Sequence, residues 1–191
     1  MVNIDKWNTL EPQWQRAFSA VYFKQVDSPT DTDLEPLFNS TVLRLAGPTA
    51  PYPNMDFELT NLSGIEQCLN LEILVITHHQ IKEITSLKSL RKLKSLFLFN
   101  NQIEELNGIE DLESLEQLYV QSNRVSSLEP LEKLTNLKEV YINNNLITSL
   151  NGLTEVHSAS LTNFYCTPNA SLPQKEIIRA ENQLGIKCKG A

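Results

Sequence analysis

Two adjacent histidines, His78 and His79, are the residues of this chain best suited to bind a metal ion or exchange protons near neutral pH. Neighbouring residues of a strand point to opposite faces, so the two imidazoles cannot chelate one ion together, and no Cys, Asp or Glu supplies a third ligand at a suitable spacing. The sequence also lacks a glycine-rich phosphate loop, a nucleophile elbow and an HExxH motif. We therefore expect no catalytic residue, no metal, no cofactor and no enzymatic activity.

Aromatic side chains that recur every 22 residues are the other candidates for chemistry. Phe97, Tyr119 and Tyr141 share one position of this period, and each stands between two aliphatic residues. Such alternation is typical of a strand with one buried face. Exposed rings in a row are costly in water, and tyrosines are common at the energetic centres of protein interfaces. The chemistry that these residues predict is the binding of another protein.

The elements that must position these rings are four copies of a 22-residue repeat, which begin at Leu71, Leu93, Leu115 and Leu137. Each copy reads L-x-x-(L/V)-x-(L/I/V)-x-x-(N/H)-x-(I/V)-x-x-(I/L)-x-x-(L/I)-x-x-(L/V). The early spacing of two predicts a short strand, and the later spacing of three predicts a tight helical or 3₁₀ turn. A single copy cannot bury its apolar edge, so neighbouring copies must stack to make the core.

This pattern resembles the leucine-rich repeat family, in the 22-residue form of bacterial internalins and of the leucine-rich regulatory subunit of protein phosphatase-1. The resemblance implies an α/β fold, a right-handed leucine-rich-repeat solenoid. Short parallel β-strands would line its concave face, 3₁₀ or helical turns its convex face, and a helical cap would cover each end.

One column of the repeat holds His79, Asn101, Asn123 and Asn145. An inward Asn at this position can satisfy backbone N–H and C=O groups that would otherwise be buried without partners. We expect Asn123 to be buried for this reason. His79 departs from the pattern, and we expect it to weaken the ladder where the ladder begins.

We divide the chain, as a single structural domain, into residues 1–48, a helical N-terminal cap, residues 49–170, the repeats, and residues 171–191, a helical C-terminal cap. Four regular copies span residues 71–158, and variant copies flank them. Apolar spacing predicts helices over residues 10–24 and 172–184, and Thr32 with Glu35 has the spacing of a capping box at a third helix. We also predict a first strand over residues 41–45. In the last copy we place Phe164 at the second inward strand position and Thr167 at the Asn position.

Charge and composition limit the partners. The formal net charge is −7, and an acidic repeat body would repel phosphate backbones and anionic lipids, so we expect neither nucleic acid nor membrane as a partner. No apolar run is long enough for a membrane span, and the first residues lack the features of a signal peptide. Three cysteines, an odd number, are typical of a reducing compartment. We expect a cytoplasmic monomer.

Aligning the copies places the outward-facing strand residues in columns. The first column is Val75, Phe97, Tyr119, Tyr141 and Asn163; the second is Thr77, Phe99, Gln121, Asn143 and Tyr165; the third is Ile73, Ser95, Gln117, Glu139 and Leu161. We predict that a protein or peptide lies across the concave face on these columns. Its anchors would be Phe97, Phe99, Tyr119 and Tyr141, with Val75 and Tyr165 at the margin and hydrogen bonds from Gln117, Gln121, Glu139 and Asn143.

The residues leave alternatives open. The rings could simply pack on one another across the strands, which would stabilise the sheet without any partner. The function we favour is that of a non-catalytic protein-interaction module. A regulatory subunit of an enzyme such as a phosphatase, and an extracellular internalin-like adhesin, are the two alternatives that the resemblance suggests.

Overall fold

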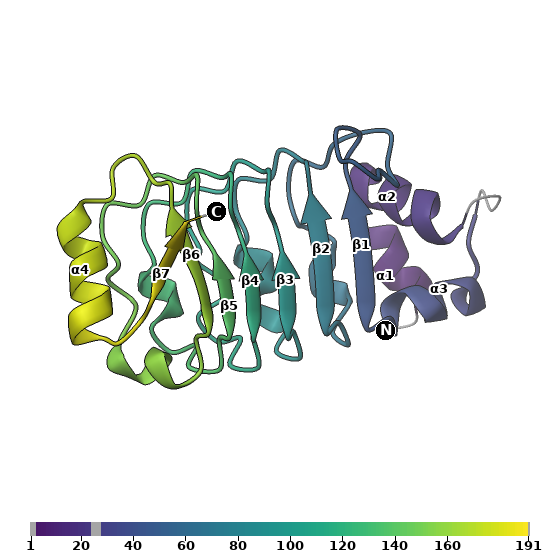
Figure 1. The fold of residues 1–191 in the computed structure, drawn as a ribbon. Coiled ribbons are helices and arrows are strands. Elements are labelled where there is room, and N and C mark those ends of the chain that lie inside the picture. Colours follow the sequence, from purple (N-terminus) through teal and green to yellow (C-terminus); the bar gives the residue numbers. More distant parts are fainter. Residues whose placement is uncertain (1–2, 24–27, 191) are drawn as a thin grey trace.

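The computed structural model describes residues 3–23 and 28–190, and within them one open sheet of parallel strands runs the length of the molecule (Figure 1). The strands are β1 (Val42–Ala46), β2 (Ile73–Thr77), β3 (Ser95–Phe97), β4 (Gln117–Tyr119), β5 (Glu139–Tyr141), β6 (Asn163–Thr167) and β7 (Cys188–Gly190). Their order in the sheet is their order in the chain. The predicted α/β repeat solenoid is therefore confirmed.

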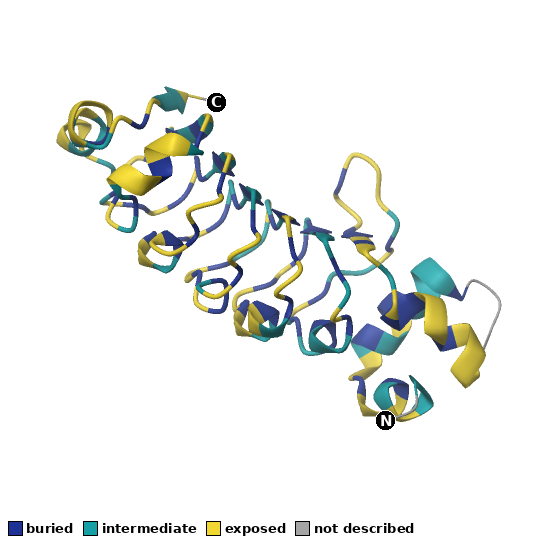
Figure 2. Ribbon diagram, turned by 90° about the horizontal axis from the view of Figure 1, so that it is seen from below, coloured by how far each residue is buried: buried dark blue, intermediate teal, exposed yellow. Residues whose placement is uncertain are grey.

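Equivalent positions of the repeat lie side by side in the sheet. Leu96 pairs with Leu118, and Leu118 pairs with Val140. These side chains are fully buried, and Figure 2 shows buried residues along the inside of every turn of the solenoid. Burying one such side chain stabilises the fold by about 1.5–3 kcal/mol, so the stacked aliphatic rows supply most of the driving force.

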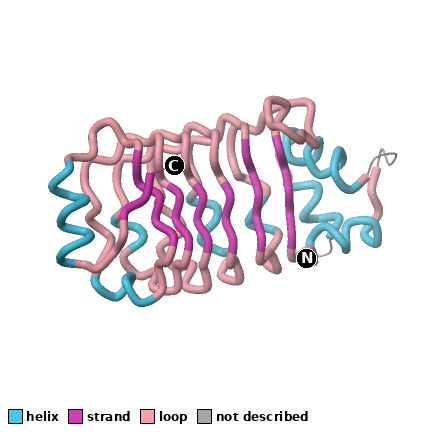
Figure 3. Tube along the Cα trace, viewed as in Figure 1, coloured by secondary structure: helices cyan, strands magenta, loops and turns pink. Residues whose placement is uncertain are grey.

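Tight turns form the side of the solenoid opposite the strands, as the spacing of three predicts (Figure 3). Short 3₁₀ helices occupy Ile65–Gln67, Thr85–Ser89, Glu129–Leu131 and Glu155–Ala159. Leu87 and Leu131 point inward from two of these turns and are completely buried. A 3₁₀ turn places every third residue on the same side, which is the spacing of these leucines.

Asn123 lies inside the turn that leaves β4, and it is 9% exposed. Its Nδ2 donates to the carbonyl oxygens of Leu98 and Val120, each at 3.0 Å, and its Oδ1 accepts from the N–H of Ile103 at 3.0 Å. One side chain thus satisfies backbone groups of two neighbouring copies. The predicted burial of Asn123 is confirmed.

His79 fills the same position at the N-terminal end of the ladder, where its ring makes two hydrogen bonds and the Asn123 amide makes four, so the expected weakening stays a prediction. Its Nδ1 accepts from the N–H of Leu59 at 3.1 Å, and its Nε2 lies 3.3 Å from the carbonyl oxygen of Leu45. The neutral imidazole has one acceptor and one donor on opposite sides, so it replaces the amide of an Asn. The ladder therefore continues through His79.

Strand β6 follows β5 after 24 residues, two more than the 22 that separate β2, β3, β4 and β5, so the predicted register for the last copy is wrong. Phe164 pairs with Val140, so it occupies the first inward strand position, not the second. Asn169, not Thr167, closes the ladder: its Nδ2 donates to Ile142 O at 3.0 Å and its Oδ1 accepts from Asn145 N–H at 2.7 Å. The two extra residues lie between Leu153 and Leu161, where His157 is fully buried and Val156, predicted at the last apolar position of the fourth copy, is exposed.

Three helices, α1 (Asn3–Thr9), α2 (Pro12–Tyr22) and α3 (Asp31–Phe38), lie beyond β1 at the N-terminal end (Figure 1). Helix α2 matches the helix predicted over residues 10–24, whereas α1 is an additional helix. Helix α3 begins two residues earlier than predicted, because Thr30 and Asp33, not Thr32 and Glu35, form the capping box. Trp14 of α2 is fully buried against Gly64, where an added Cβ would lie 2.6 Å from the indole.

The C-terminal end carries helix α4 (Gln174–Gln183), close to the predicted range of 172–184, and it ends before Gly185, whose φ is 71°. Strand β7 follows and was not predicted. It pairs with β6 and so extends the sheet by one strand. None of the helices in the part of the chain that the structure describes is long and apolar enough to cross a membrane.

Candidate protein-binding surface

The outward side of the sheet, here called the strand face, carries a continuous row of aromatic rings. In the sheet, Phe97 pairs with Tyr119, Tyr119 with Tyr141, and Tyr141 with Tyr165 on neighbouring strands. Their ring centroids are 4.7, 4.3 and 4.3 Å apart, and the planes of the two tyrosine pairs differ by only 13° and 17°. Parallel strands are about 4.8 Å apart, so equivalent rings on successive strands must stack. We call these four residues the aromatic column.

Tyr165 belongs to the aromatic column, which corrects its predicted place at the margin in the second column. Asn163, predicted in the first column, pairs instead with Glu139. The two-residue insertion before β6 causes both changes. Val75, one strand before Phe97, continues the row toward the N-terminal end.

The four rings are each partly buried, because their faces cover one another while their edges stay open. The alternative that these rings pack on one another is therefore realised. Offset aromatic pairs contribute about 0.5–1.5 kcal/mol each beyond the area they bury. The stack fixes the rings in one conformation, so a partner that covers their edges would meet a surface that is already ordered.

A polar row borders the aromatic column on the side where the strands begin. Ser95 Oγ donates to Gln117 Oε1 at 2.7 Å, and Gln117 Nε2 lies 3.4 Å from Glu139 Oε2. The Tyr119 hydroxyl donates to the same carboxylate oxygen. Burial, helped by this hydrogen bond, raises the pKa of Tyr119 above its usual range, so the phenol stays neutral. Glu139 is thus already engaged within the strand face.

A second row, Phe99, Gln121 and Asn143, lies where the strands end. Phe99 does not join the stack; its ring meets that of His78 edge-on, with centroids 5.6 Å apart. Asn143, predicted to supply a hydrogen bond to a partner, is only 6% exposed. The side-chain oxygens of Gln121 and Asn143 have no hydrogen-bond partner among the described residues.

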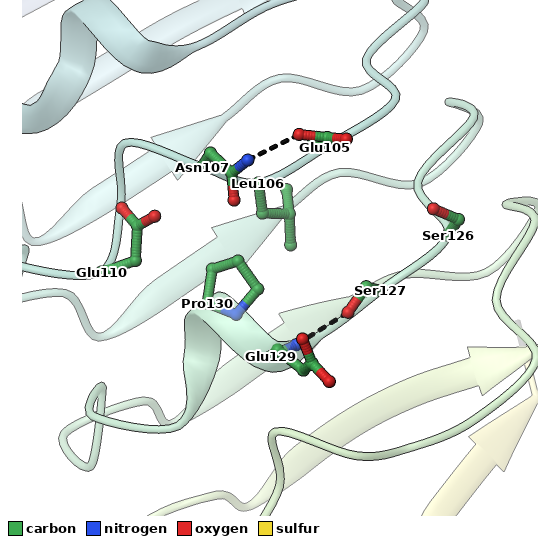
Figure 4. A pocket seen from close by; sticks show the side chains of 8 residues that line it. All are labelled: Glu105, Leu106, Asn107, Glu110, Ser126, Ser127, Glu129 and Pro130. Atoms are coloured by element: carbon green, nitrogen blue, oxygen red, sulfur yellow. Dashed lines mark hydrogen bonds between the residues drawn. The ribbon is translucent and has the colours of Figure 1, made fainter.

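A pocket of about 420 Å³ lies on the turn side, between two successive convex turns (Figure 4). Three carboxylates line it, those of Glu105, Glu110 and Glu129, and no basic residue does. Glu110 accepts from the N–H of Gly108 at 2.6 Å, and Glu105 accepts from Asn107 Nδ2 at 2.5 Å. These carboxylates therefore stabilise their own turns. The described residues contain no group of three or more His, Cys, Asp and Glu placed to hold a metal ion.

Comparisons with known proteins agree with this geometry. The family profile described as leucine-rich repeats in two copies matches residues 113–155, which hold β4, Asn123 and β5. An internalin of Listeria monocytogenes, InlF, is 28% identical over 62% of this chain, with a TM-score of 0.54. Residues 113–155 match leucine-rich repeats, and the chain has the leucine-rich-repeat fold. Its likeness to that internalin covers 37% of the internalin's own length.

Two further solved structures share the fold of this chain. A leucine-rich-repeat protein of Leptospira interrogans is 21% identical with a TM-score of 0.58, covering 81% of this chain and 44% of that one. The functional domain of the internalin InlJ of Listeria monocytogenes is 21% identical with a TM-score of 0.52, covering 77% and 30%. The chain thus spans less than half of each of these structures. A comparison with curated proteins finds no match.

Sequence reasoning missed a group of residues at the N-terminal end of the sheet: Arg44 of β1 and the exposed loop residues Pro51 and Tyr52. They border a pocket on the strand face next to Val75 and Phe99. The signal for this loop is the proline-rich run over residues 47–53, which interrupts the repeat. Such a run predicts an insertion but not the direction in which the inserted chain folds.

Proposed function

We propose that this leucine-rich-repeat protein is a non-catalytic interaction module that binds a protein or peptide across its strand face. The observation that carries the proposal is the aromatic column, a continuous row of four partly exposed rings. Leucine-rich repeats typically serve protein binding, and internalins are among the structural neighbours.

The strand face suits a polypeptide partner for two reasons. Tyrosine combines a large rigid apolar surface with a hydroxyl, and it loses little conformational entropy on binding because the stack already fixes it. The polar rows on both sides are mostly uncharged, and the charge of Glu139 is held by Tyr119 and Gln117. An apolar centre with a polar border is the usual anatomy of a protein interface.

The proposal is tested by affinity purification with the whole chain as bait, followed by mass spectrometry. Phe97→Ala with Tyr119→Ala should lose the partner that the native chain retains. A matched control, Leu146→Ala with Val156→Ala, removes exposed apolar side chains outside the aromatic column and should retain it. Thermal unfolding of both variants shows whether each is folded. Retention of the same partner by the folded Phe97/Tyr119 variant would contradict the proposed surface.

We also propose that the protein works as a cytoplasmic monomer, and the free thiols of Cys68, Cys166 and Cys188 support a reducing compartment. The likeness to internalins favours a test of the alternative, an extracellular adhesin. Fractionation of cells with an antibody against the chain separates the two, since an adhesin is recovered at the cell surface. Co-purification of a phosphatase would instead favour the regulatory-subunit alternative.

A further inference from the structure

The loop between β1 and Leu59 is an insertion that only the first copy contains among those described. Leu43 lies beside Leu74, 31 positions later, whereas Leu74 lies beside Leu96, 22 positions later. The inserted residues stand up from the strand side of the solenoid next to β1 (Figure 2). The loop begins at Gly47, where an added Cβ would lie 1.8 Å from the carbonyl oxygen of His78, so only glycine allows this close approach.

The loop is held in place by hydrogen bonds to the free edge of β1. Asn54 Oδ1 accepts from the N–H of Ala46 at 2.7 Å, and Asn54 Nδ2 donates to the carbonyl oxygen of Arg44 at 2.7 Å. Met55 is buried beneath it. The loop therefore covers an edge that would otherwise offer unpaired backbone groups, and it forms a fixed wall beside the strand face.

Between this wall and the strands lies a pocket of about 360 Å³, large enough for one amino-acid residue. Its sides are apolar, from Pro51 and Tyr52 of the loop and from Val75 and Phe99 of the sheet. Tyr52 is 83% exposed, the most open of the large hydrophobic residues of the described chain. An exposed ring beside a pocket of apolar walls is a surface that gains by being covered.

Arg44 supplies the charge of this pocket, and no Asp or Glu of the described chain lines it. The guanidinium donates one hydrogen bond to Tyr52 O and takes part in none of the ion pairs between described residues. The nearby Asp56 is paired with Arg16 at 2.9 Å. A guanidinium has five N–H donors in a planar fork that matches a carboxylate, so Arg44 has donors to spare.

His78 adds a second donor without an acceptor. Its Nε2 lies 2.9 Å from Asn100 Nδ2, an amide that donates, so the proton of the neutral imidazole belongs on Nδ1. That Nδ1 has no hydrogen-bond partner and is shielded from water. The imidazole would have to turn about its χ2 bond to present this donor to a ligand, so Arg44 makes the primary contact.

We propose that this pocket binds the C-terminal residue of a peptide, with the terminal carboxylate on Arg44 and a large apolar side chain among Pro51, Tyr52, Val75 and Phe99. The inference rests on the proposed function, because the pocket lies at the N-terminal end of the strand face and a peptide crossing the aromatic column would end there. It adds the chemistry of the partner: a chain end that is apolar and anionic.

The test titrates the isotopically labelled full chain with two small probes and follows the backbone signals of Val75 and Phe99 by NMR. N-acetyl-L-phenylalanine carries the carboxylate of a chain end, and its amide carries the same ring without the charge. The acid should give saturable shifts with a roughly millimolar dissociation constant, and the amide should bind at least about tenfold more weakly. Equal binding of the two probes, or no saturable shift with the acid, would overturn the proposal.

Two variants and a third probe sharpen the test. Arg44→Gln should abolish the preference for the acid, whereas the control Arg124→Gln, which removes an exposed arginine outside the pocket, should keep it. N-acetyl-aspartyl-phenylalanine amide places the carboxylate on a side chain and should bind no better than the phenylalanine amide; binding equal to the acid would contradict a chain-end site. Neither Phe97 nor Tyr119 lines the pocket. A negative probe titration therefore leaves the proposed function standing. Retention of the partner by the Phe97/Tyr119 variant would likewise leave the result of the probe titration unaffected.

Discussion

His79 and Asn123 occupy the same position of the repeat, one in the first regular copy and one in the middle of the solenoid. Both are buried and both connect the backbones of two neighbouring copies. They differ in chemistry, since the imidazole titrates and the amide does not. The repeat therefore demands a donor and an acceptor at this position but accepts more than one residue that supplies them.

The largest expected effect is a pH dependence of the unfolding free energy, which His79 should cause and Asn123 should not. Burial lowers the pKa of His79 to about 4 from an ordinary value of 6.5, against the smaller opposing influence of its bond to Leu45 O. The unfolded chain thus binds a proton at higher pH than the folded chain. The native protein should lose up to about 3 kcal/mol of unfolding free energy as the pH falls from 6.5 to 4, with full stability retained above 6.5.

His79→Asn provides the control, because it installs the residue of the other copies and cannot titrate. All carboxylates, and also His78, remain in both proteins, so their contributions cancel in the difference between the two. Urea unfolding at pH 4, 5, 6 and 7 measures this difference. Parallel stability curves for the two proteins would show that His79 is not held neutral in the fold.

A second prediction concerns the amide itself. Asn123→Ala should lower the free energy of unfolding by about 1–3 kcal/mol, because it leaves Ile103 N–H and the carbonyls of Leu98 and Val120 with one partner fewer in a buried site. Ser114→Ala, at an exposed turn, should change it by less than about 0.5 kcal/mol. Equal effects of the two substitutions would argue against the ladder.

The smallest expected effect is on the backbone turn beside the ladder. His78, Asn100, Ser122 and Asn144 share one position and all have φ between 56° and 60°. Asn tolerates this left-handed region better than Ser. Ser122→Asn should therefore raise the unfolding free energy by roughly 0.5 kcal/mol, measured by urea unfolding, whereas Ser126→Asn should not raise it.

The periodic part of the fold was predictable because each apolar slot repeats at a fixed interval, and Asn123 and the aromatic rings followed from that register. The two-residue insertion before β6 was not predictable from the sequence, because Phe164 is apolar and fits either of two inward positions two residues apart. The pairing of Phe164 with Val140 and the hydrogen bonds of Asn169 distinguish them. That error moved Tyr165 out of the aromatic column.

The pocket beside β1 shows a second kind of limit. The proline-rich interruption after residue 46 signals an insertion, but the loop's position depends on Asn54 reaching back to the edge of β1, a contact between side chain and backbone with no sequence period. His79 shows a third limit, because a family pattern of Asn does not reveal that an imidazole has the same pair of donor and acceptor.

The most direct test of the strand face is the affinity of an identified partner for Tyr119→Ala, measured by isothermal titration beside the unfolding free energy of the same variant. Tyr119 stands in the middle of the aromatic column, with rings on both sides. We predict a loss of binding of about 2 kcal/mol or more, whereas Val156→Ala, on a convex turn, should leave binding unchanged. Native affinity in a folded Tyr119→Ala protein would contradict the account and would place the binding surface away from the aromatic column.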